Sequence, residues 1–274
     1  MRIIGGAIVA VMLAGVVAAQ AGPLSSPPAE PAPLDDSRVA ISTLVREDYF
    51  AGFIDKDMVR HERAMAATET LLKTRPERDR AGLLAWKAGG LMFKAALANE
   101  AGNKAEYRRL FTESQATLAE ARKLAGTQDG AVFAVGGGIG VLFADRLAKE
   151  DRPAVWAQTY ELYSSLCALQ CAFADKLPPH LRGELMGGLV TSAQRTGHTE
   201  EMNANLDKML VLVKDTPYEA TAKMWKADPK VAANSSLSCK NCHDAGRLAP
   251  TLMTLNAKAA AATQAATPPS PTAK

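Results

Sequence analysis

The residues best suited to chemistry lie near the C-terminus, in the run Cys239-Lys240-Asn241-Cys242-His243. Two thiols three positions apart can form thioether bonds with the two vinyl groups of one porphyrin, and the histidine that follows can bind the iron as its proximal ligand. The run therefore predicts one covalently attached c-type haem, held by Cys239 and Cys242, with His243 on the iron. The alternative is a local disulfide between the same two cysteines.

The N-terminus has the features of an export signal. Arg2 is followed by an apolar stretch over residues 3–18 and by a small-x-small sequence at residues 19–21. The stretch contains glycines and is short for a transmembrane helix. We therefore expect a signal peptide over residues 1–21, a periplasmic or secreted mature chain, and no membrane span after cleavage. An uncleaved anchor is the main alternative. Because haem c is attached outside the cytoplasm, the signal and the C-x-x-C-H run support each other.

The composition argues against some partners and favours a helical fold. The formal net charge is +3 and falls to +2 (3 − 1) on cleavage, because the signal carries one charged side chain. So small a charge does not indicate a nucleic acid or an anionic membrane as partner. Hydrophobic residues make up 47% of the chain and aromatic residues 5%, which favours closely packed helices over sheets. No acid–base pair or nucleophile–histidine arrangement stands out, so we expect no enzyme, although a haem-dependent activity such as that of a peroxidase stays open.

Helical patterns fill the middle of the chain between two segments that are not expected to fold. Residues 22–36 are rich in proline and are expected to form an extended, mobile linker. Residues 257–274 are rich in Ala, Thr, Gln and Pro and are expected to be disordered or weakly helical. Between them we assign a helical domain to residues 37–217 and a haem segment to residues 218–256.

Glycine clusters recur along the helical domain at intervals of about 48 to 50 residues. They lie near the middle of the first helix of each expected pair, at residues 89–90, 136–138 and 187–188. Turn signals recur at nearly the same spacing, at residues 102–103, 150–151 and 197–198. This regularity predicts antiparallel helical hairpins stacked side by side. The small residues are expected to let neighbouring helices approach closely, so Gly138→Leu is predicted to cost ~1–3 kcal/mol or more.

The helical domain resembles the tetratricopeptide-like repeat families over residues 47–218. The resemblance is carried by residues 101–106 and 118–125, by Trp86, Gly90 and Phe93, and by a weaker copy at residues 196–201. The period exceeds the family's usual length of roughly 34 residues. The resemblance implies an all-α solenoid of stacked helical hairpins whose surface binds a protein partner, and it implies no reaction.

The second pair of cysteines, Cys167 and Cys171, lies on an apolar helical stretch and is not followed by histidine. Buried, unpaired thiols are the simplest expectation. A disulfide within the helix and a zinc site shared with Cys239 and Cys242 are the alternatives, and zinc would leave His243 without a role.

Two further features have simple interpretations. His61, His180 and His198 are expected to be solvated or capping residues, although His180 and His198 flank the last helical pair and so lie within reach of a haem near it. The glycine-rich run over residues 136–140 does not indicate a dinucleotide-binding loop, because Val141 stands where the third glycine is required.

The haem segment is too short to bury a porphyrin alone. We expect the haem to lean on the last helical pair, with the lining Met224, Trp225, Leu248, Leu252 and Met253. The stretch after His243 resembles that of monohaem cytochromes c, which implies that the Pro250 carbonyl orients His243. Pro250 is also expected to break any helix between His243 and Met253. Met253 and Met224 are near-equal candidates for a sixth iron ligand, and a thioether there favours electron transfer, whereas an open position favours small-ligand binding.

Together these features predict an exported all-α protein with a short C-terminal haem-attachment segment that carries one haem c. Its expected role is electron transfer or haem-based docking, with the helical array binding a protein partner and the redox partner unknown. The rival interpretation is a non-haem periplasmic helical-repeat scaffold in which the C-x-x-C pair forms a disulfide.

Overall fold

The computed structural model describes residues 32–232 and 248–266. Every regular element within these ranges is a helix, which confirms the all-α prediction. The expected signal peptide, most of the proline-rich segment, the C-x-x-C-H run and residues 267–274 lie outside the described residues. None of the helices in the described ranges is both long and apolar enough to cross a membrane.

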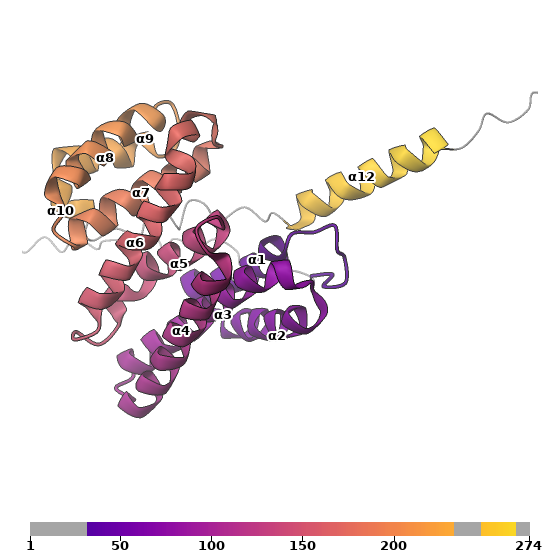
Figure 1. The fold of residues 1–274 in the computed structure, drawn as a ribbon, viewed down its shortest axis with the longest axis horizontal. Coiled ribbons are helices and arrows are strands. Elements are labelled where there is room, and N and C mark those ends of the chain that lie inside the picture. The colour runs from indigo at the N-terminus through magenta and orange to yellow at the C-terminus, as the bar shows by residue number, and fades with distance from the viewer. Residues whose placement is uncertain (1–31, 233–247, 267–274) are drawn as a thin grey trace, which may run out of the picture. The chain divides into compact units, whose positions relative to one another are not determined.

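Helices follow one another in pairs joined by short connections (Figure 1). The pairs are α1 (Ile41–Asp55) with α2 (Met58–Thr74), α3 (Arg80–Glu100) with α4 (Lys104–Ala125), α5 (Gly130–Phe143) with α6 (Arg152–Gln170), and α7 (Pro179–Arg195) with α8 (Thr199–Leu212). Short 3-10 segments are η1 (Glu77–Asp79), η2 (Ala144–Arg146) and η3 (Cys171–Lys176), and the chain continues in α9 (Glu219–Ala227), α10 (Pro229–Ala232) and α12 (Leu248–Ala266). In each pair the two helices pack against each other.

The connections between helices lie where the turn residues predict them. Gly102, Gly126 and Gly197 have φ of 72°, 59° and 79°, a left-handed region that glycine adopts without steric cost. The side chains of Asn103 and Asp129 accept hydrogen bonds from backbone N–H groups in the first turns of α4 and α5. These caps satisfy donors that have no partner inside the helix. Local residue chemistry thus sets where the helices end.

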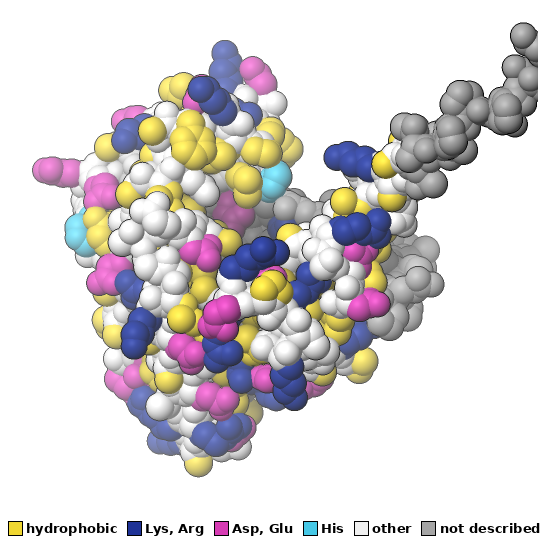
Figure 2. Space-filling model, turned by 45° about the vertical axis from the view of Figure 1, so that its right-hand side comes forward, with side chains coloured by type: hydrophobic (Ala, Val, Ile, Leu, Met, Phe, Trp, Pro, Cys, Tyr) yellow, Lys and Arg dark blue, Asp and Glu magenta, His cyan; other side chains and the backbone are white. Residues whose placement is uncertain are grey.

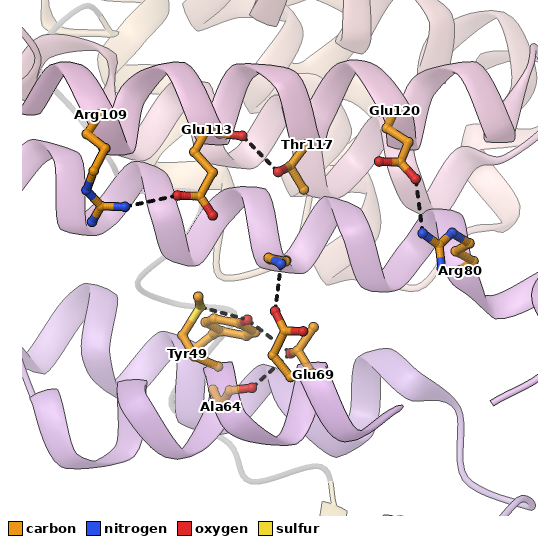
Figure 3. Close-up of polar contacts among 11 residues, drawn as sticks. Tyr49, Ala64, Glu69, Arg80, Arg109, Glu113, Thr117 and Glu120 are labelled. Atoms are coloured by element: carbon orange, nitrogen blue, oxygen red, sulfur yellow. Dashed lines mark hydrogen bonds and ion pairs between the residues drawn. The ribbon is translucent and has the colours of Figure 1, made fainter. Parts of the chain in front are cut away.

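The first helices of the pairs form a row, which we call the first-helix row. In it α1 contacts α3, α3 contacts α5 and α5 contacts α7, while the short α10 also contacts α7. Each second helix lies against its own first helix, and α2 and α6 also contact the first helix of the next pair. Ion pairs link adjacent helices across the surface, such as Lys87 with Glu69 at 2.6 Å and Arg80 with Glu120 at 3.2 Å (Figure 3).

Two hydrophobic cores lie along the row. The N-terminal core contains the aromatic side chains of α1, α3 and α5, among them Tyr49, Phe93 and Phe143. The C-terminal core is formed by α5 to α10 and includes Tyr163 and Trp225. Because α9 contributes Trp225 to this core, the predicted boundary between residues 217 and 218 does not separate two units. The correction has a simple cause: the amphipathic α9 buries its apolar face on α8.

Both ends of the described chain are more ordered than the composition predicts. The guanidinium of Arg75 donates to the carbonyl of Asp36 at 2.8 Å, so the expectation of a mobile linker was wrong for residues 32–36. The expectation of a disordered tail was wrong for residues 257–266, which continue α12. Alanine has the highest helix propensity, which offsets the lack of burial. Pro250 does not break the helix, because it lies in the first turn, where its missing N–H has no intrahelical acceptor.

Glycines do allow helices to approach, but Gly138 is not one of them. A Cβ atom added at Gly137 would lie 2.8 Å from the Tyr163 ring, and one at Gly188 would overlap the same ring. A Cβ added at Gly140 would overlap Thr159. At Gly138 it would meet no atom within 4 Å. The predicted cost of Gly138→Leu through overpacking was therefore wrong, because this glycine lies on the open side of α5.

Candidate functional site

The C-x-x-C-H run is flanked by two described helices that belong to different parts of the fold. Ala232, which ends α10, is fully buried in the C-terminal core. Leu248, which begins α12, donates its N–H to the Glu47 carboxylate of α1 at 2.7 Å. Cys239 lies seven positions after Ala232 and His243 five positions before Leu248. The run therefore connects the C-terminal core to α1.

The start of α12 is held on α1 by polar and apolar contacts. The Glu47 carboxylate accepts one of the first N–H groups of the helix and also interacts favourably with its positive end. Leu248, Leu252 and Leu255 pack against the N-terminal core. Arg38 donates to the Asn256 side chain at 3.1 Å. These contacts fix the chain a few residues after His243.

The expected haem lining does not form one surface. Trp225 is 1% exposed and packs in the C-terminal core, whereas Leu248 and Leu252 pack against the N-terminal core. The prediction failed because the apolar residues after the run face α1 rather than the last helical pair. The Pro250 carbonyl accepts the Thr254 hydroxyl within α12 at 2.9 Å. It is engaged inside a helix, which corrects its expected role in orienting His243.

The two candidate sixth ligands both have accessible thioethers. Met253 of α12 is 73% exposed and Met224 of α9 is 42% exposed. Neither is used in a hydrophobic core, so each sulfur is free of the packing that would have to be broken for it to reach an iron. Both stay predictions.

His61 is a site that the sequence interpretation missed. It was expected to be solvated or capping, but it is 0% exposed and its ring packs 5.0 Å from that of Phe93 and 5.8 Å from that of Tyr49. Neither ring nitrogen has a partner in hydrogen-bonding geometry. The signal was present in the spacing, because His61 shares a helical stripe with the buried residues Ala64, Thr68 and Leu71.

Acid is expected to destabilise the N-terminal core through His61. Burial lowers the pKa of His61 from its usual 6.5, with Lys94 lowering it further and the Glu62 carboxylate raising it. The unfolded chain therefore binds a proton at pH values where the folded chain does not, so stability is full above the unfolded pKa and falls as the pH drops below it. Thermal unfolding at about pH 7.5 and about pH 5 should show a larger loss for the parent than for His61→Phe. Equal losses would contradict this assignment.

The other histidines lie at helix starts and do not converge on one place. The His198 ring stacks on Tyr160 with centroids 4.2 Å apart, and its Nδ1 lies 2.7 Å from the Thr196 hydroxyl. The Tyr160 hydroxyl donates to the Glu201 carboxylate, which raises the pKa of the phenol. This arrangement joins α6 to α8 on the surface. It has the geometry of a structural contact between pairs.

Cys167 and Cys171 form a disulfide, so the expectation of unpaired thiols was wrong. The α-helix ends at Gln170 and the chain continues in the 3-10 segment η3. The two Cα atoms are 4.7 Å apart, within the range that a disulfide can bridge. Since these sulfurs are bonded to each other, they do not supply thiolates to a shared zinc site. Within residues 32–232 and 248–266, no cluster of His, Cys, Asp and Glu is suited to holding a metal ion.

Breaking this disulfide is expected to destabilise the protein modestly. It closes a short loop, with a sequence separation of 4, so the loss of unfolded-state restraint in Cys167→Ser plus Cys171→Ser should be near the low end of the usual range, roughly 2 kcal/mol. Urea unfolding with and without reductant measures it. The parent should respond to reductant and the double variant should not; a reductant effect in the variant would contradict the assignment.

Charged side chains are distributed without a field of one sign on the face shown in Figure 2, where Lys, Arg, Asp and Glu are interspersed. Many of them are paired, as Arg122 is with Glu161 at 3.2 Å and Arg108 with Asp151 at 2.8 Å. Exposed pairs of this kind contribute little to stability. They link neighbouring second helices.

No family model, curated protein or solved structure matches this chain. Its function is therefore inferred from its own residues and their arrangement.

Proposed function

We propose that this protein is an exported c-type haem protein in which Cys239 and Cys242 hold one haem and His243 binds its iron. The observation that carries the proposal is the C-x-x-C-H run in a chain that begins with an export signal. The donor set fits the group, because two thiols match two vinyl groups and an imidazole suits the iron. When bound, the haem supplies one-electron transfer or a site for a small ligand.

The chain's own residues would restrict where this group lies. The buried Ala232 fixes the chain before Cys239, and the contact between Glu47 and Leu248 fixes it after His243. A loop held at both ends loses less conformational freedom when its side chains bind. This supports electron transfer or haem-based docking, in which the haem must keep a defined position for its partner.

The helical domain is proposed to be a tetratricopeptide-like solenoid that binds a protein partner. Support comes from the turns between paired helices and from the contacts along the first-helix row. The first helices α3 and α7 are almost wholly buried, whereas α2 and α4 each bury one stripe and leave the rest of their surface accessible. The second helices therefore offer the larger surface to a partner.

The visible spectrum of denatured protein from a host able to mature cytochromes c tests the proposal directly. A haem that stays with the unfolded chain is expected. The competing function, a non-haem scaffold with a Cys239–Cys242 disulfide, gains support from the disulfide between Cys167 and Cys171, which shows that closely spaced cysteines pair in this chain. A colourless protein would favour that scaffold.

A thioether sixth ligand predicts a sulfur–iron charge-transfer band in the oxidised protein. Met253→Ala or Met224→Ala should abolish the band, depending on which sulfur binds, and the other variant serves as the matched control. Loss of the band should lower the reduction potential, because a thioether raises it. Absence of the band in the parent protein would eliminate both candidates.

A further inference from the structure

α5 differs from the other paired helices because it has no polar side chain: its sequence is GAVFAVGGGIGVLF. One face is fully buried, and it includes Phe133, Ile139 and Phe143. The opposite face is only partly covered, and its residues follow helical spacing. They are Ala131, which is exposed, and the half-buried Ala134, Val135, Gly138, Val141 and Leu142. We call this set the open face of α5.

The open face is accessible at its centre. A Cβ atom added at Gly138 would meet no atom within 4 Å. Val135 and Val141 touch the cores with their inner edges. A purely apolar surface left open on an otherwise charged protein marks a place where another group docks.

The ends of residues 233–247 indicate what covers this face. The segment starts at α10, which packs on α7, and ends at α12, which packs on α1. These helices lie at the two ends of the first-helix row, so the segment must cross α3 and α5. Its 16 Cα steps (248 − 232) span at most ~53–58 Å when extended, and three helix-to-helix steps amount to roughly 24–30 Å. The segment is therefore long enough to cross the row.

The position of the cysteines in this segment matches the position of α5 in the row. Cys239 and Cys242 lie seven and ten steps after Ala232, close to the midpoint of the 16 steps. α5 and α3 are the inner helices of the row. Their hairpin partners, α6 and α4, cover the other side. The open face of α5 is the side of this helix that stays accessible to a crossing chain.

The segment alone is a poor cover for an apolar face, because most of its side chains are polar and Leu237 is its one large aliphatic residue. A porphyrin attached to Cys239 and Cys242 would supply the missing apolar area. We propose that the open face of α5 is the docking surface for the haem carried by residues 233–247, an inference that rests on the proposed function. Small residues at its centre, Ala134 and Gly138, let a flat ring lie close to the helix.

Methyl resonances of the intact haem protein test this docking. In protein labelled at Val and Leu methyl groups, oxidation to the paramagnetic ferric state should shift the signals of Val135, Val141 and Leu142. Val59 and Val211, which are 81% and 76% exposed on α2 and α8, serve as controls and should not shift. If haem is attached and the α5 methyls stay unshifted, the docking is overturned while the proposed function stands. If no haem is attached, both are overturned.

A charge placed on the open face gives a second, independent test. Gly138→Glu puts a carboxylate where space is open, so the fold should be kept, as far-UV circular dichroism checks. A negative charge beside the haem stabilises the ferric state, so the reduction potential should fall. Val211→Glu adds the same charge on α8 and should leave the potential unchanged. Equal potentials for the two variants would overturn the docking surface.

Discussion

Replacing Cys239 and Cys242 together with alanine is expected to remove covalent haem completely, from one haem per chain to none. Each thioether bond needs a cysteine sulfur, and no other cysteine pair in this chain is followed by histidine. Haem staining of denatured protein and its visible spectrum measure the loss. The expected change is all-or-none, because haem held only by His243 does not survive denaturation.

The second cysteine pair provides the matched control. Cys167 and Cys171 are bonded to each other, so their replacement by alanine should leave the haem in place. A third variant, His243→Ala, should keep the covalent haem but change its spectrum, because it removes the iron ligand and leaves the thioethers. Haem that persists in the Cys239→Ala plus Cys242→Ala variant after denaturation would refute the attachment site.

Gly188→Ala is expected to lower the free energy of unfolding by ~1–3 kcal/mol or more, the usual cost of overpacking a core. The Tyr163 ring is 0% exposed and lies between Gly188 of α7 and Gly137 of α5. A methyl group at position 188 would overlap the ring, and the ring cannot retreat because the backbone at Gly137 confines it on the other side. The two helices would have to separate.

The same substitution at Gly138 is the control for this effect. A Cβ there meets open space, so Gly138→Ala should be neutral or stabilise the protein by up to ~1 kcal/mol, through the better helix propensity of alanine. Urea unfolding followed by far-UV circular dichroism compares the two variants. If both glycines respond alike, the close approach of α5 and α7 at Tyr163 is not what the structure describes.

Local residue chemistry determined much of this protein without reference to its fold. The sparse aromatic residues and the helical stripes predict the all-α class. Glycines with positive φ end α4 and begin the turns after α3 and α7, and they were recognisable because few other residues adopt this conformation. The haem chemistry belongs to the same level, since Cys239, Cys242 and His243 are adjacent in the chain and their meaning depends on spacing alone.

Tertiary structure decided which of several equivalent residues met a partner. Three consecutive glycines at positions 136–138 look alike in the sequence, yet two face core side chains and Gly138 faces outward, because the rotation of α5 between α3 and α7 selects the face. Likewise, a histidine beside charged neighbours gives no local sign of burial, and only the packing of α1 and α3 around His61 removes it from water.

The attachment of α12 to α1 is the clearest case that only the folded chain reveals. Leu248 and Glu47 are separated by 201 positions, and no periodicity links residues so far apart. Helix propensity and capping act over a few residues and can be read from the sequence. Contacts between distant segments depend on the summed burial of many side chains, so the position of the haem-bearing segment relative to α1 and α5 follows from the fold.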